Sequence, residues 1–222
     1  GDLRDLHSFP TRRSSDLQLA RAYVILRSTD PKVERVLRDA LRLEPDNPQF
    51  TQQLALTLFR MERTDTEAMP VYERAVRDNP RDLEIGRQLA KTYNKNGRYG
   101  EALQLAQSLL PLAPDDEELK RLVALSSLYD NKIDQAINEY TEILTRNPED
   151  HEAVVNLALA YAQKGRTDDS AARCYQPALT LTPENDNLHL IMALGQAARR
   201  DMARCFAAQN AIFRAERLQA PT

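Results

Sequence analysis

The stretch "IGRQLAKTYNKNGRYGEALQLAQSLLPLAP", residues 85–114, carries two helical patterns on either side of a glycine-containing turn. Its first half has Leu-Ala-x-x-Tyr at 89–93, and its second half has Ala-x-x-x-Ala-x-x-Leu at 102–109. Spacings of three and four place these residues on one face of a helix. Gly97 stands where the first helix should end, and Pro114 follows the second pattern. The stretch therefore predicts two helices joined by a tight turn.

The same pattern recurs along the chain at intervals of 34 or 35 residues. Prolines follow the second helical pattern at positions 45, 80, 114, 148 and 183, and an alanine stands ten residues after each of them. Ala20 holds the equivalent place in a partial first unit. Small residues at these places let two helices approach closely, so each unit is predicted to be a packed helical hairpin. Units 46–80 and 149–183 are one residue longer, and we expect the extra residue in the turn between their two helices.

This period and these columns resemble the tetratricopeptide repeat family over about residues 18–200. The aromatic residue of the family at the fourth position of the first helix is missing, because Gly86, Lys120 and Val154 hold that place. The resemblance implies an all-α, right-handed solenoid of about five to six stacked hairpins, with a concave groove that binds a partner peptide or protein. It implies a protein-interaction scaffold without catalysis. An accessory, substrate-docking region of a larger enzyme, whose catalytic domain is missing from this fragment, is the alternative.

Composition narrows the remaining functions. The 222 residues have a net charge of −3, so no basic face for nucleic acid is indicated. No run of apolar residues is long enough to cross a membrane. The three histidines and two cysteines show no metal-ligand spacing, so we expect no metal and no cofactor, with Cys174 and Cys205 buried and inert. Pro111 and Pro177 are expected to bend the helices that contain them.

In the tetratricopeptide family the groove is lined by set positions of the first helix of each unit. The residues at those positions that we select as candidate ligand contacts are Gln52, Arg87, Lys91, Asn94, Lys95, Arg121 and Asn156. The basic ones among them suit a partner peptide of acidic character, and a merely solvated face is the alternative. A clamp for a terminal carboxylate is not expected, since Glu118 or Glu152 would face the ligand. Tyr23, Tyr93 and Tyr161 occupy packing positions, so we predict core tyrosines rather than a stacking ladder.

Three regions follow from this interpretation. Residues 1–17 resemble a translated sequencing-library adapter, with sixteen of seventeen residues in agreement and only Leu3 different. We expect that segment to be non-native and disordered. Residues 18–185 are predicted to form the repeat array with a truncated first unit. Residues 186–222 are predicted to form an atypical terminal helix pair, either a cap or a docking face. We predict no cellular compartment, because the native N-terminus is expected to be missing.

Overall fold

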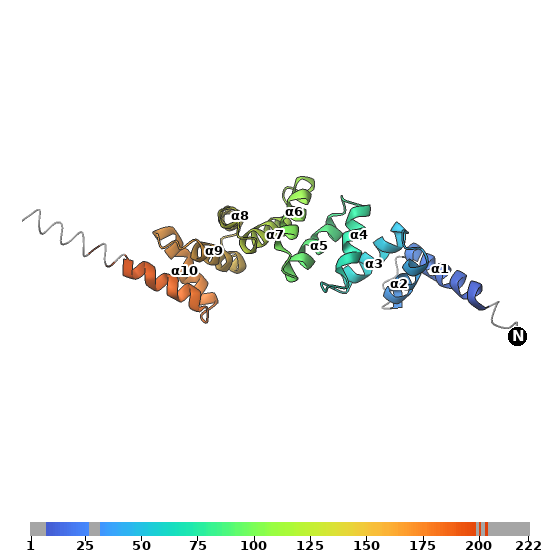
Figure 1. Ribbon diagram of the computed structural model, residues 1–222. Coiled ribbons are helices and arrows are strands. Elements are labelled where there is room, and N and C mark those ends of the chain that lie inside the picture. The colour runs from blue at the N-terminus through green and yellow to red at the C-terminus, as the bar shows by residue number, and fades with distance from the viewer. Residues whose placement is uncertain (1–7, 27–31, 199, 201–202, 204–222) are drawn as a thin grey trace, which may run out of the picture. The chain divides into compact units, whose positions relative to one another are not determined.

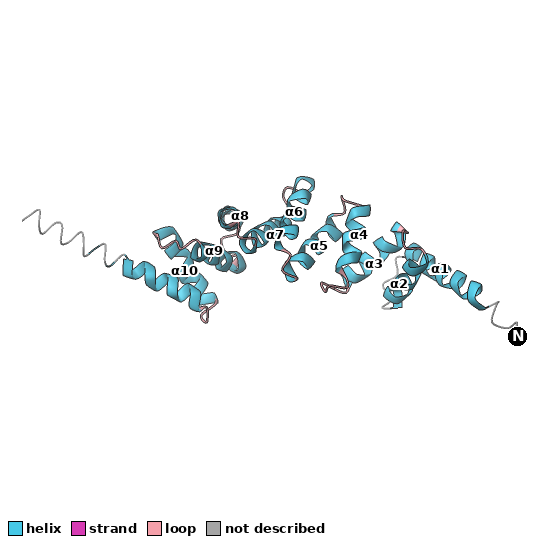
Figure 2. Ribbon diagram, in the orientation of Figure 1, coloured by secondary structure: helices cyan, strands magenta, loops and turns pink. Residues whose placement is uncertain are grey.

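The computed structural model describes residues 8–26, 32–198, 200 and 203, and describes residues 8–14 through their backbone alone. Every regular element among these residues is a helix, and none is a strand (Figure 2). The chain divides into two compact units, residues 1–126 and residues 127–222. The prediction of an all-α chain is therefore confirmed.

Unit 1 contains successive helical hairpins (Figure 1). Its helices are α1 (Ser8–Leu26), α2 (Lys32–Leu43), α3 (Pro48–Arg60), α4 (Met69–Asp78), α5 (Leu83–Lys95), α6 (Tyr99–Leu109) and the first part of α7 (Glu117–Tyr129), which belongs to this unit as far as Ser126. Each helix from α1 to α6 packs against the next in the chain. In addition, α1 packs against α3 and α3 against α5, so the first helices of consecutive hairpins form one layer. Stacked hairpins of this kind are an α-solenoid.

Unit 2 repeats the arrangement with three complete helices and a fourth helical segment. The helices are α8 (Ile133–Arg146), α9 (His151–Gln163) and α10 (Asp169–Leu181), followed by a helical segment at 186–198. α9 packs against both α8 and α10.

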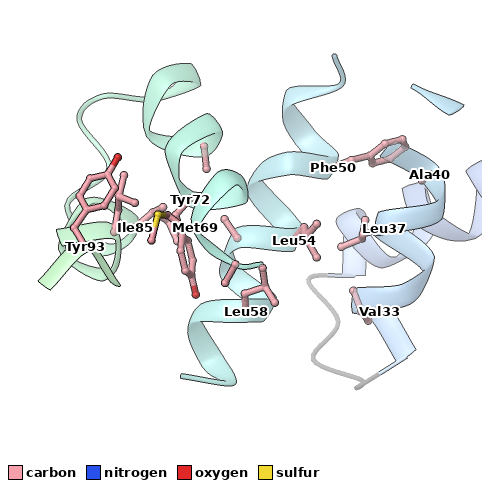
Figure 3. Packing of buried hydrophobic residues seen from close by; sticks show 14 of the residues in the cluster. Val33, Leu37, Ala40, Phe50, Leu54, Leu58, Met69, Tyr72, Ile85 and Tyr93 are labelled. Atoms are coloured by element: carbon pink, nitrogen blue, oxygen red, sulfur yellow. The ribbon is translucent and has the colours of Figure 1, made fainter. Parts of the chain in front are cut away.

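The alanine column predicted from the repeat lies in the core. Its members from the five N-terminal units are all fully buried: Ala20, Ala55, Ala90, Ala124 and Ala158. Figure 3 shows how the larger side chains fill the space around such positions in unit 1, with Leu37 of α2 facing Leu54 of α3. In the same view, Met69 and Tyr72 of α4 lie next to Ile85 of α5. Small and large residues thus alternate across the helix contacts, as close packing requires.

Each first helix of a hairpin begins with the same kind of cap, two residues after the repeat proline. The Asn47 side chain accepts hydrogen bonds from the backbone N–H groups of Gln49 and Phe50 at 3.0 and 3.2 Å. At the equivalent places, a side-chain oxygen accepts the backbone N–H of the residue three positions later, in Asp82, Asp116, Asp150 and Asn185. These caps satisfy backbone donors that the first helical turn leaves open, which explains the Pro-x-Asp/Asn pattern of the turns.

The same helices also end alike, on one residue with a left-handed backbone. The φ angle is 52° at Glu62, 75° at Gly97, 61° at Asn131 and 67° at Gly165. The next residue then donates its N–H to the carbonyl five residues earlier, at 2.8–3.0 Å in all four turns. This is the Schellman arrangement, in which glycine has the lowest backbone cost. The predicted helix-ending role of Gly97 is confirmed, and Gly165 ends its helix in the same way; the sequence did not reveal the role of Glu62 and Asn131.

The two longer units do carry their extra length in the turn. Eight residues separate α3 from α4 and five separate α9 from α10, against three between α5 and α6. In the first long turn Arg63 forms an ion pair with Asp65, whose other carboxylate oxygen accepts from the N–H groups of Glu67 and Ala68. The Tyr72 hydroxyl donates to the Arg63 carbonyl at 3.0 Å.

The second long turn has the same bonds. Arg166 Nε lies 2.6 Å from Asp168, which accepts from the N–H groups of Ser170 and Ala171. The Tyr175 hydroxyl donates to the Arg166 carbonyl at 2.5 Å. The shared Arg-Thr-Asp sequence therefore produces the same closed turn in both units.

The short turn between α5 and α6 has no aspartate two residues after its arginine. Arg98 donates to Glu73 of α4 at 2.8 Å and to Glu101 at 3.0 Å. Its guanidinium lies 4.4 Å from the centre of the Tyr93 ring, and the Tyr93 hydroxyl donates to the same Glu73 at 3.0 Å. Burial raises the pKa of Tyr93 to about 12. This arginine thus joins its turn to the preceding hairpin.

Several local expectations were wrong. Pro111 does not bend α6, because the helix ends at Leu109 and the proline lies in a 3₁₀ turn, Leu110–Leu112. Such a turn tolerates a proline, since the missing N–H would fall where the α-helical ladder has already stopped. By contrast, Pro177 lies inside α10. Cys174 is free but only half-buried, with its thiol pKa raised by burial. Cys205 lies outside the described residues.

The N-terminal end of the array also differs from its prediction. Residues 8–17 are helical in α1, whereas the adapter interpretation led us to expect disorder there. Leu17 packs on the core of unit 1, and each residue added to an existing helix gains a backbone hydrogen bond. Residues 1–7 lie outside the described residues. At the other end, Ala193 is exposed although its column is buried elsewhere, which fits an atypical terminal unit.

Candidate interaction face

The layer of first helices brings the predicted groove residues of unit 1 onto neighbouring elements. α3 contacts α5 directly. The Ser126 hydroxyl of α7 donates to the side-chain oxygen of Asn94 on α5 at 3.0 Å. Asn94 and Ser126 are both buried. The candidate residues of α3, α5 and α7 therefore lie on one continuous set of helices, which we call the α3–α5–α7 face.

Three of the candidates form a row of cations on α5. Arg87, Lys91 and Lys95 follow at intervals of four residues, so they lie along one side of the helix. Arg87 Nη1 lies 2.8 Å from Asp116 Oδ2 and 3.4 Å from Glu118 Oε2. These two carboxylates precede and begin α7. The first cation of the row is thus already neutralised within the chain.

The remaining two cations differ in their surroundings. Lys91 pairs with Glu118, and the two side chains are 41% and 42% exposed. An ion pair at this exposure contributes about 0–1 kcal/mol. Lys95 is exposed, and among the residues that the structure describes no acidic side chain pairs with it. The row therefore begins with the guanidinium of Arg87, which is paired within the chain. It ends with the exposed ammonium group of Lys95, which pairs with no described acidic side chain.

The other candidates are less accessible to a partner. The Gln52 amide is half-buried and donates to Asp82 at 2.5 Å. The side-chain nitrogen of Asn94 is buried and has no hydrogen-bond partner in the described part of the chain. Arg121 is half-buried on α7, and Asn156 is buried on α9 in unit 2. Lys91 and Lys95 are consequently the candidates best placed to meet a partner.

Sequence reasoning missed a second feature of unit 1, an open pocket of about 760 Å³. Its walls come from the end of α1, one side of α3, the turn between α4 and α5, and the first turn of α5. The lining residues are Val24, Ile25, Pro48, Gln49, Gln52, Gln53, Leu56, Arg60, Asp78, Asn79, Asp82 and Glu84. Three carboxylates face one guanidinium here. The only sequence signal was the run of acids around Pro80, which is also typical of a turn followed by a helix start.

Other kinds of site find little support in the described residues. No group of three or more His, Cys, Asp or Glu side chains within them could hold a metal ion. No helix there has the length and apolar character needed to cross a membrane. Tyr93 and Tyr161 are buried and Tyr23 is half-buried, so their rings pack inside the hairpins as predicted.

The comparisons with known proteins agree with this geometry. Two family models, both described as tetratricopeptide repeat, match residues 66–125 and 124–186, which together exceed half of the 222 residues. The chain belongs to the tetratricopeptide repeat family. Tetratricopeptide repeats are in general non-catalytic modules for protein interaction, so this chain is a protein-interaction scaffold in that general sense.

Solved tetratricopeptide structures share the fold at low sequence identity. A tetratricopeptide repeat protein from Parabacteroides merdae is 20% identical, with a TM-score of 0.55 over 90% of this chain and 78% of that one. MamA from Desulfovibrio magneticus is 18% identical, with a TM-score of 0.57 over 77% of this chain and 97% of that one. These similarities establish the helical-repeat fold.

Proposed function

We propose that this tetratricopeptide scaffold binds an extended acidic segment of a partner protein along the α3–α5–α7 face, with Lys91 and Lys95 as the principal contacts. The proposal rests on one observation: Lys95 is an exposed cation without an acidic partner in the described residues, one helical turn from a weakly held surface pair. Gln52, Arg87, Asn94 and Arg121 remain secondary candidates on this face, and Asn156 remains a separate candidate on unit 2.

A carboxylate of a partner can take the place of Glu118 in the Lys91–Glu118 pair. Both side chains of the pair are two-fifths exposed, so their mutual attraction is small. A carboxylate from a partner can replace Glu118 at Lys91 at little cost, while a neighbouring carboxylate reaches Lys95. Arg87 stays fixed, because Asp116 holds it at 2.8 Å and is itself tied to the Leu119 N–H at the start of α7.

A labelled peptide tests this proposal without knowledge of the natural partner. The probe is a fluorescein-labelled, eight-residue peptide of alternating Ser and Glu, and the readout is fluorescence anisotropy with the full chain. We expect Lys95→Glu to weaken binding about fivefold, since it replaces an attraction by a repulsion at an exposed site. Glu118→Gln should strengthen binding about twofold, because it removes the internal competitor.

Arg77→Glu is the matched control. Arg77 is an exposed arginine on α4, a second helix of a hairpin, and the substitution makes the same change in charge away from the face. Binding should therefore equal that of the unmodified chain. Equal weakening by Lys95→Glu and Arg77→Glu, or no binding by the unmodified chain, would overturn the proposal.

A further inference from the structure

We infer that the pocket walled by α1, α3 and the α4–α5 turn is a separate docking point that takes an aliphatic side chain flanked by a lysine or arginine from a partner protein. This goes beyond the proposed function, because the pocket shares only Gln52 with the candidate contacts of the α3–α5–α7 face and selects a ligand of opposite charge. The inference uses none of the cations of α5.

One wall of the pocket is apolar. Val24 and Leu56 are half-buried and pack on the core of unit 1, and Ile25 projects beside them with 80% of its side chain exposed. Water contact with so much aliphatic surface is unfavourable, and an aliphatic side chain of a partner laid against it would be bound by the hydrophobic effect. This wall fixes the first part of the ligand's chemistry.

The lining contributed by α4 and α5 carries two carboxylates whose own cation partners are distant or absent among the described residues. Asp78 has only a distant pair, with Arg74 Nε at 3.9 Å, and Arg74 donates instead to Asp46 at 2.7 Å. Glu84 is exposed on the first turn of α5, and no cation pairs with it in the described part of the chain. Two carboxylates at the rim are thus open to an ammonium or guanidinium group of a partner.

The third carboxylate is structural. Asp82 accepts the Ile85 N–H at 3.1 Å through one oxygen and the Gln52 amide at 2.5 Å through the other. Its charge still adds to the negative potential of the pocket. Gln49 also lines the pocket and is exposed, and its side-chain amide offers both a donor and an acceptor to the backbone of an extended ligand.

Arg60 is the only cation in the described lining of the pocket. It lies at the end of α3, is exposed, and pairs with no acid among the described residues. One guanidinium against three carboxylates leaves the lining negative, so charge complementarity favours a basic ligand. An acidic segment would meet net repulsion here.

Four labelled peptides test the inference with the full chain by fluorescence anisotropy: eight-residue peptides of alternating Leu and Lys, Ser and Lys, Leu and Glu, and Ser and Glu. The Leu/Lys peptide should bind best. The double variant Asp78→Lys/Glu84→Lys should weaken it about tenfold, since two exposed attractions become repulsions. Ile25→Ser should weaken it about threefold through loss of the apolar wall.

The control variant is Asp115→Lys/Glu149→Lys, which makes the same change in charge at two exposed turn positions outside the pocket. It should leave binding of the Leu/Lys peptide unchanged. Equal losses in the two double variants, or equal binding of the Leu/Lys and Ser/Lys peptides, would mean general attraction of cations and would overturn the inference. Binding of the Ser/Glu peptide reports on the α5 cations separately, so that a failure here is distinguishable from a failure of the proposed function.

Discussion

The turn between α3 and α4 and the turn between α5 and α6 begin with the same backbone structure but differ in the residues that follow. Both start from a left-handed residue and an N–H that bonds back across the helix end. The longer turn then closes on itself, because Asp65 binds Arg63 and accepts the Ala68 N–H just before α4. The shorter one begins its second helix at once, and Arg98 reaches Glu73 of the preceding hairpin. The inserted residues thus give the long turn an ion pair between Arg63 and its own Asp65, while Arg63 also reaches the preceding hairpin through a longer pair, 3.6 Å to Glu34 of α2.

Substitution of the left-handed residue should have the largest effect on either turn. Gly97→Ala and Gly165→Ala should each lower the free energy of unfolding by about 1–2 kcal/mol, because a Cβ atom disfavours positive φ. The two substitutions should lower the free energy of unfolding by the same amount, since the short turn and the long turn share the same kind of helix end. Thermal denaturation followed by circular dichroism measures the loss.

The reciprocal substitutions serve as the control for backbone strain. Glu62→Gly and Asn131→Gly introduce glycine where the chain already has φ of 52° and 61°. Both variants should match or exceed the stability of the unmodified chain, with Glu62→Gly gaining more because asparagine tolerates this conformation better than glutamate does. A loss in both would show that these side chains stabilise the turns by other means.

Removal of a tyrosine hydroxyl should have the next largest effect on stability, and the effect should differ between the long and the short turns. Tyr72→Phe and Tyr175→Phe each remove a hydrogen bond to the arginine carbonyl of a long turn, and should lower stability by about 1 kcal/mol. Tyr140 stands at the same place in α8, after a short turn, and its buried hydroxyl has no partner in the described residues. Tyr140→Phe should therefore be neutral or stabilising. A loss as large as that of Tyr72→Phe would contradict this distinction.

Low pH should destabilise mainly the long turns, and this loss of stability should be the smallest of the predicted effects. The hydrogen bond from Arg166 is the main reason that the pKa of Asp168 falls to about 2, and Arg63 likewise holds the pKa of Asp65 well below its usual range. A lowered folded-state pKa means stability that is present above about pH 4 and is lost as the pH falls toward 2. The melting temperature of the unmodified chain should decline over that interval.

Asp168→Asn tests the assignment of this decline. Asparagine still accepts the N–H bonds of the α10 cap but does not titrate, so the variant should lose less stability between pH 4 and pH 2 than the unmodified chain loses. The double variant Asp65→Asn/Asp168→Asn should flatten the curve further. Identical slopes in all three proteins would assign the acid sensitivity to other carboxylates.

The repeat made much of this fold predictable. The alanine column and the extra residue in the long turns both follow from local pattern, and local pattern is what a single sequence displays. Glu62 and Asn131 were missed because left-handed helix ends are usually signalled by glycine. Pro111 was misjudged because the sequence does not distinguish a bent helix from one that has already ended in a 3₁₀ turn.

The candidate site was less predictable because it depends on pairs of residues from different repeats. The sequence placed Arg87, Lys91 and Lys95 on one side of a helix, and the structure agrees. It did not show that Asp116 and Glu118 would come within reach of the first two, because the charges lie about thirty residues apart. The acid-lined pocket was missed for the same reason.

The Arg63 carbonyl has a consequence for how the array unfolds. This oxygen accepts from Tyr72 within its own hairpin and also from the Gln88 amide of the next, at 3.1 Å. If α5 frays, this oxygen loses one of its two hydrogen bonds, so local opening in one repeat weakens its neighbour. Such shared acceptors add to the nearest-neighbour coupling that makes a linear array melt cooperatively. In hydrogen-exchange measurements, the amides of α4 and α5 should therefore open together.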